Sequence, residues 1–202
     1  MDSVELSPTT RWGMVFIGLL QGGLCYLLMA YLAPQNSDWL FYGMPVTIAF
    51  SSALLLTVVS FKQRALWCWM ALICVVVLAM SVWLKWSVAD SDRWRQDDIF
   101  FAYGWRLLLM AMLALPWMQY QLHARREQAR YPQFYTYLWL NSLTLLIAVV
   151  ANGLFWLVLL LWSEMFQLVG ITFFNTLFFE TDWFVYLALG LITALAVVLA
   201  RT

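Results

Sequence analysis

Polar side chains that interrupt long apolar stretches are the first candidates for chemistry in this sequence. These side chains belong to Gln21, Arg106, Asn141 and Asn152. Arg106 matters most, because a charged group near the centre of a membrane helix costs from about 2.5 to above 10 kcal/mol. It therefore needs a partner, a water-filled cavity or a path along which its guanidinium reaches the interface. Glu164, just beyond the apolar run 137–162, is the nearest candidate partner.

Arg106 has two interpretations. An ion pair with Glu164, or an arginine that reaches outward to water and phosphates, gives it a structural role, which we favour. The alternative is a polar intramembrane site for a bound or transported anion, formed by Arg106, Glu164 and Asn152. A continuous polar path around Arg106, Asn152 and Gln21 would favour transport, but these residues lie on separate apolar runs with few polar neighbours.

Side chains that build metal, redox and catalytic centres are sparse. His123 is the single histidine of the chain, so no second histidine exists for a histidine-based metal site. Cys25, Cys68 and Cys74 lie within apolar runs at no paired spacing, which favours free buried thiols. No phosphate-binding loop, dinucleotide fingerprint or nucleophile elbow occurs. The sequence therefore predicts no catalytic residue, no metal and no cofactor.

Acidic side chains gather outside the apolar runs. Four of them lie in the segment 85–98: Asp90, Asp92, Asp97 and Asp98. Their oxygens suit a hard cation, but arginines lie among them and the segment lacks the glycine and distal glutamate of an EF-hand loop. We therefore interpret 85–98 as a solvated turn. Carboxylates clustered on the outer side, around a groove at Glu164, Glu180 and Asp182, would favour an enzyme of lipid or cell-envelope chemistry. Such an enzyme is the third candidate for the function.

The surroundings of these residues are those of a membrane protein. Of 202 residues, 64% are hydrophobic and 11% are charged, and 11 Lys and Arg balance 11 Asp and Glu. Soluble domains are about 45–50% apolar and about 25% charged. Lipid must therefore be the solvent for most of the chain. The balanced charge indicates no nucleic-acid partner.

Six apolar runs are long enough to cross a hydrocarbon core about 30 Å thick. They occupy residues 13–33, 40–61, 65–84, 99–118, 137–162 and 183–200. We expect an all-α polytopic bundle of six transmembrane helices, forming a single transmembrane domain over 1–202. In the segment 163–182, apolar and polar residues alternate at helical spacing, which predicts a short external amphipathic or re-entrant helix.

Lysine and arginine predict the orientation of the bundle. Seven of them fall on one side of the runs and three on the other: Arg11, Lys62, Arg64, Arg125, Arg126, Arg130 and Arg201 against Lys85, Arg93 and Arg95. Both termini are therefore expected to be cytoplasmic. The basic segment 123–134 is expected to touch anionic lipid headgroups, with a docking site for a cytoplasmic partner as the alternative.

Small residues spaced four apart predict close helix packing. The pairs are Gly18 with Gly22, Ala49 with Ala53, and Gly190 with Ala194. We expect these surfaces to serve packing inside the bundle, and an interface between two copies is the alternative.

The stretch 154–184 carries a resemblance to a known family. Its pattern is an aromatic and aliphatic helix ending in Trp162, Glu164 and Phe166, then Leu168-Val169-Gly170-Ile171, Phe173-Phe174, Phe178-Phe179 and Trp183-Phe184. It resembles a family of bacterial polytopic membrane proteins catalogued as domain of unknown function four-one-five-three. The resemblance implies a bacterial cytoplasmic membrane and carries no activity. Because members of that family look longer, the chain resembles an N-terminal portion.

These observations favour a non-enzymatic membrane protein that binds or scaffolds other membrane components. The expected partners are membrane lipid and another membrane protein or a second copy of this chain, with no nucleic acid. The runner-up function is a transporter or channel component with a polar site near Arg106.

Overall fold

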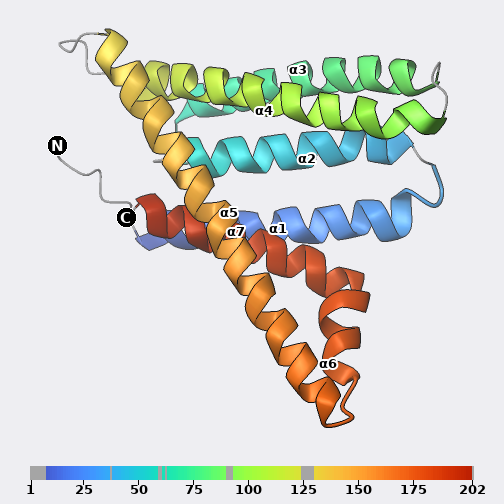
Figure 1. The fold of residues 1–202 in the computed structure, drawn as a ribbon. Coiled ribbons are helices and arrows are strands. Elements are labelled where there is room, and N and C mark those ends of the chain that lie inside the picture. Colours follow the sequence, from blue (N-terminus) through green and yellow to red (C-terminus); the bar gives the residue numbers. More distant parts are fainter. Residues whose placement is uncertain are drawn as a thin grey trace. The chain divides into compact units, whose positions relative to one another are not determined.

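A computed structural model describes residues 8–36, 38–58, 61, 63–89, 93–123 and 130–201. Helices and two π-helical segments make up most of this part of the chain (Figure 1). They are α1 (Pro8–Leu27), η1 (Leu28–Leu32), α2 (Asp38–Thr57), α3 (Arg64–Ala89), α4 (Arg93–His123), α5 (Arg130–Leu168), α6 (Phe173–Asn175), η2 (Thr176–Glu180) and α7 (Asp182–Arg201). The described residues contain no strand, so the prediction of an all-α fold is confirmed.

Within the described residues, six stretches of helix are long and apolar enough to cross a membrane. They are Pro8–Leu32, Asp38–Thr57, Arg64–Ala89, Asp98–Leu122, Pro132–Leu168 and Asp182–Arg201. Each overlaps one of the six predicted apolar runs, so the predicted number of candidate spans is confirmed. Large apolar side chains remain exposed along them, for example Val75, Leu113 and Leu199. A chain dissolved in lipid needs no second protein layer to cover such groups.

Several helices extend beyond the apolar runs. Helix α3 continues to Ala89 and α4 begins at Arg93, so helix occupies much of the predicted turn 85–98. Helix α5 takes up the first part of the predicted external segment and ends before Gly170, whose φ of 84° lies in the left-handed region. Apolarity ends at the membrane interface, whereas a helix continues until a residue such as this glycine stops it.

The chain divides into two compact units. Unit 1 consists of Met1–Ala30 and Leu143–Thr202, and unit 2 consists of Tyr31–Ser142. Helix α5 contributes its first turns to unit 2 and the rest to unit 1. The single transmembrane domain over 1–202 stays a prediction.

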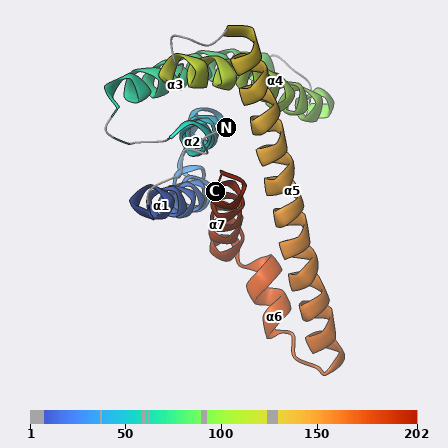
Figure 2. The same cartoon turned by 90° about the vertical axis from the view of Figure 1, so that its left-hand side faces the viewer.

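In unit 1, α1 packs along α7, and the two helices lie side by side in Figures 1 and 2. The buried positions of α1 follow one another at nearly every fourth residue: Thr10, Met14, Gly18, Gly22 and Cys25. This spacing places them on one face of the helix. After the turn at Gly170, α6 and η2 lead back along α5 to the start of α7, and Phe174 of α6 stacks on Phe166 of α5 at 4.3 Å between ring centroids.

Unit 2 is built on α2, α3 and α4, which pack against one another. Its core is apolar and centres on Leu55, Leu66, Met70, Leu84 and Met118, whose side chains are almost completely buried. Ser51 and Thr57 on α2 donate hydrogen bonds to the carbonyls of Thr47 and Ala53, each at 2.6 Å. These hydroxyls are thereby satisfied within their own helix, as membrane helices require.

Candidate functional site

Arg106 lies on α4 with an exposed side chain. Its guanidinium carbon is 4.9 Å from the ring centroid of Trp83 on α3. This distance is within the range of a cation–π contact, which is worth about 0.5–1 kcal/mol at an exposed site and about 2 kcal/mol or more when desolvated. Arg106 therefore has an aromatic partner inside unit 2. Glu164 is an exposed residue of unit 1, so its pairing with Arg106 stays a prediction.

Asn152 joins α5 to α7 within unit 1. Its Nδ2 donates to the Ala148 carbonyl at 2.9 Å and to Thr193 Oγ1 at 3.0 Å. The Asn152 Oδ1 atom is buried and accepts no hydrogen bond from the described residues, and the same holds for Gln21 Oε1 on α1. A buried acceptor without a donor costs about 1–3 kcal/mol. Gln21 and Asn152 thus share a unit, whereas Arg106 belongs to the other.

Asn141 joins two helices of unit 2, as Asn152 does in unit 1. It exchanges two hydrogen bonds with Gln119 of α4, at 2.9 and 3.0 Å. Gln119 Nε2 also donates to the Leu56 carbonyl at 2.8 Å, in the last turn of α2. Such carbonyls have no partner inside their own helix. The Gln119 amide therefore ties α2, α4 and the start of α5 together.

Sequence reasoning singled out Asn141 but missed Gln119. Gln119 follows the apolar run 99–118 by one residue, so it interrupts none of the apolar runs. Its 5% exposed fraction shows that it is buried. The available signal in the sequence was Pro116, because a proline within a membrane helix is tolerated where neighbouring groups satisfy the backbone that it frees. In the structure Pro116 is fully buried, one turn before Gln119 on α4.

Ser81 and Tyr103 make a second buried polar contact in unit 2. Their hydroxyl oxygens lie 2.9 Å apart and join α3 to α4. The exposed fractions of the two residues are 0% and 5%. This pair was also missed, because serine and tyrosine are ordinary members of apolar membrane helices and neither interrupts a run.

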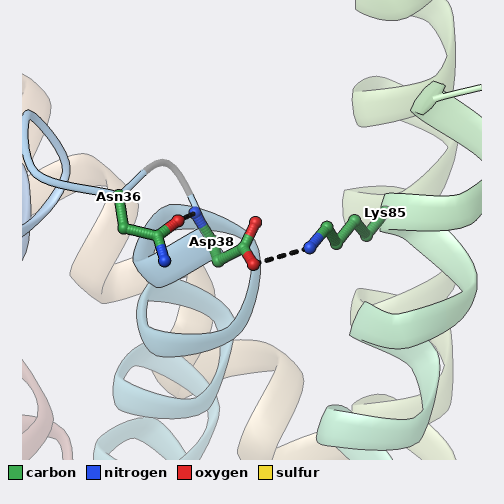
Figure 3. A network of polar contacts seen from close by, with 3 residues as sticks. All are labelled: Asn36, Asp38 and Lys85. Carbon is green, nitrogen blue, oxygen red and sulfur yellow. Dashed lines mark hydrogen bonds and ion pairs between the residues drawn. The ribbon is translucent and has the colours of Figure 1, made fainter.

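Asp38 and Lys85 form an ion pair at one end of unit 2 (Figure 3). Lys85 Nζ lies 2.6 Å from Asp38 Oδ2, and the Asp38 backbone N–H donates to Asn36 Oδ1 at 2.9 Å. The Lys85 ammonium also lies 5.7 Å from the ring centroid of Tyr42. Both charged side chains are about two-fifths exposed, at 39% and 41%, so water screens their attraction.

The small residues of α1 and α7 come together at the centre of unit 1. A Cβ atom on Gly18 would lie 2.5 Å from the Gly190 carbonyl oxygen, and one on Gly22 would lie 2.9 Å from Leu187 Cα. Ala194 faces Gly18 at the same contact. On α2, Ala53 is buried and Ala49 is half-buried. Backbone therefore meets backbone where α1 crosses α7, and only glycine leaves room for this approach.

Metal-ligating residues do not gather in the described part of the chain, where no group of three or more His, Cys, Asp and Glu is found. Asp90 and Asp92 lie outside the described residues, as does 124–129 of the basic segment, and the side chains of Asp97 and His123 are not described. All three cysteines are free. Cys25 is buried and Cys74 half-buried, but Cys68 is exposed, so the prediction of a buried thiol is wrong there. Cys68 lies on the outer face of an apolar helix, which lipid covers.

The described surfaces include two hollows of note. One, of about 170 Å³ in unit 2, is lined by Trp117, Tyr120, Gln121 and Phe134. The other, of about 530 Å³ in unit 1, is lined by Trp156, Leu157, Leu160, Phe179 and Val185. The second is within the size range of ligand pockets, about 300–1,000 Å³, and the first is smaller.

Comparison with known proteins identifies a family without adding an activity. No curated protein and no solved structure matches the chain. The model of the family described as Domain of unknown function (DUF4153) matches residues 49–202. This range includes the aromatic stretch 154–184, so the resemblance seen in the sequence is confirmed. The chain therefore belongs to the DUF4153 family.

Proposed function

We propose that this integral membrane protein is a non-enzymatic component of the bacterial cytoplasmic membrane, which binds or scaffolds other membrane components. The observation that supports this function is the use made of polar side chains within the spans. In unit 2, Gln119 bonds Asn141 and Ser81 bonds Tyr103. In unit 1, Asn152 bonds Thr193. These groups join helices to one another.

Transport through the protein would require a different arrangement. Polar groups along a permeation path face water or solute, so their hydrogen-bonding capacity stays available. Here the amides of Gln119 and Asn141 are turned towards each other, and the Arg106 guanidinium stacks on Trp83. Gln119, Asn141 and Arg106 therefore support a structural role better than a conducting one.

The proposed topology has both termini in the cytoplasm. It rests on the distribution of Lys and Arg, seven on the proposed inner side and three on the outer side. The proposed partners are membrane lipid and a second membrane protein or copy of this chain. The wide apolar surfaces of the helices are suited to such partners, because association inside a bilayer depends on shape and packing.

Affinity purification of the full chain from native membranes, after chemical cross-linking, tests this function. We expect defined proteins or lipids to co-purify in constant ratio to the chain, and to be retained by Arg106→Lys. Solute flux or substrate turnover that Arg106→Leu abolishes, while the level of protein in the membrane is unchanged, would contradict a binding or scaffolding role.

A further inference from the structure

The hollow of about 530 Å³ in unit 1 is a groove between three elements. Helix α5 contributes Trp156, Leu157 and Leu160, η2 contributes Phe179, and α7 contributes Val185. The Trp156 and Phe179 rings face each other at 6.0 Å between centroids. All five side chains are uncharged, and Leu157 and Leu160 are about half exposed. The groove is thus apolar and open along α5.

The groove lies between two contacts that α5 makes within unit 1. At Asn152, α5 is hydrogen-bonded to Thr193 of α7. Towards its C-terminal end, Phe166 of α5 stacks on Phe174 of α6. Between these two contacts, Phe179 of η2 lies beside Trp156 of α5.

Phe178 and Phe179, which are neighbours in η2, have different surroundings. Phe178 is buried and packs on Phe174 and Phe184, at 5.8 and 5.4 Å between ring centroids, so it holds η2 against its neighbours. Phe179 is 41% exposed and faces Trp156 in the groove. The wall of the groove can therefore be changed at Phe179 without removing the residue that positions η2.

The dimensions and depth of the groove indicate its occupant. On α5 the lining runs from Trp156 to Leu160, which is about 6 Å at helical rise and far shorter than the roughly 30 Å of a helix crossing the bilayer. Trp156 lies six residues before Trp162, the last residue of the apolar run, and is thus about 9 Å inside the interface. At that depth the surrounding medium is lipid hydrocarbon.

We propose that this groove holds one hydrocarbon chain of a membrane lipid, which packs on Trp156 and Phe179 and runs along α5 past Leu157 and Leu160. This inference rests on the proposed function and specifies one of its partners by chemical class. Under the proposed topology the lipid belongs to the outer leaflet. A transmembrane helix of another protein is too long for the groove, because its length of roughly 30 Å far exceeds the stretch of α5 that lines the groove.

Photolabelling tests the proposal on the full chain. The chain is reconstituted in vesicles of phosphatidylethanolamine and phosphatidylglycerol whose acyl chains carry a diazirine, irradiated and digested, and the adducts are mapped. We expect Leu157, Leu160 and Val185 to be labelled about tenfold more than Val149 and Val150, the ratio that a difference of about 1.4 kcal/mol in binding free energy gives. Val149 and Val150 are matched references, because they lie on the same helix and are 61% and 50% exposed.

A bulky side chain in the groove provides the variant. Leu157→Trp should abolish the excess labelling at Val185 and leave that at Val149 unchanged. Leu154→Trp is its control, since Leu154 is exposed on α5 and does not line the groove. Equal labelling of groove and reference residues overturns the proposal, as does labelling at Val185 that Leu157→Trp leaves intact.

A second experiment separates this proposal from the proposed function. With a photo-crosslinking amino acid at Leu160 in native membranes, we expect lipid adducts, whereas protein adducts overturn the lipid chain as occupant. If groove and reference residues are labelled equally while the partners still co-purify with the chain, the lipid-binding groove is refuted and the proposed function is not. Turnover or solute flux that depends on Arg106 refutes the proposed function, whatever the labelling pattern.

Discussion

The two units hold their membrane helices together in different ways. In unit 1, α1 and α7 approach until the backbone at Gly18 and Gly22 meets the backbone at Gly190. In unit 2, side chains join the helices, as in the bonds of Gln119 to Asn141 and to the Leu56 carbonyl. Since lipid is as apolar as leucine, burial alone does not drive helices together. Close packing and hydrogen bonding are the two remaining means; the closest backbone contact lies in unit 1, and the network of side-chain amides lies in unit 2.

Breaking the backbone contact of unit 1 should have the largest effect. In Gly190→Leu, the new Cβ would meet the Gly18 carbonyl oxygen and lie 3.1 Å from the Gly22 nitrogen. Backbone cannot move aside as a flexible side chain can, so we expect α1 and α7 to separate at a cost near the upper end of about 1–3 kcal/mol. The loss would be measured as a lower midpoint of thermal unfolding in detergent and a lower level in membranes.

Gly153→Leu is the matched control for this change. Gly153 lies on α5, and a Cβ atom there meets nothing within 4 Å. The same substitution should therefore leave the unfolding midpoint nearly unchanged. Equal losses for Gly153→Leu and Gly190→Leu would show that leucine itself, and not the contact between α1 and α7, is responsible.

The amide contact of unit 2 should be the next most sensitive. Gln119→Leu removes bonds to both Asn141 and the Leu56 carbonyl, whereas Asn141→Leu removes only the first. Hydrogen bonds between membrane helices average about 0.6 kcal/mol and reach about 1.7 kcal/mol. We expect Gln119→Leu to destabilise more than Asn141→Leu, and the double variant to lose less than the sum of the two. Additive losses in chemical unfolding would mean that the two amides act independently.

The Arg106 contact distinguishes two uses of a membrane arginine. If Trp83 is its partner, Trp83→Leu should destabilise unit 2 by about 0.5–1 kcal/mol, and the effect should disappear in an Arg106→Leu background. If Glu164 is its partner, Glu164→Gln should be the change whose effect disappears. Unfolding midpoints of both double variants decide between these outcomes.

The sequence was sufficient for the spans and insufficient for the contacts between them. Apolar runs such as 183–200 predict helices because a bilayer accepts little else. The ends of α5 could not be placed in this way, because the helix leaves the apolar run and stops only before Gly170. Gln119 and Ser81 were missed for another reason. Whether a polar side chain faces a partner depends on how its helix is rotated about its own axis and packed. A span that is covered by lipid on most sides is apolar all round, so its hydrophobic pattern says little about that rotation.

Breaking the ion pair of Asp38 with Lys85 should change stability least, although its 2.6 Å is the shortest polar distance described between the helices of unit 2. Exposed ion pairs contribute about 0–1 kcal/mol, because water screens the charges and both side chains lose rotamer freedom. Lys85→Gln should therefore lower the unfolding midpoint less than Asn141→Leu does, and added salt should remove the difference from the parent chain. A loss larger than that of Asn141→Leu, or one that high salt leaves unchanged, would show that Lys85 acts through its aliphatic stem and the ring of Tyr42. Unit 2 would then depend on packing in the same way as unit 1, and the contrast between the two units would rest on the amides alone.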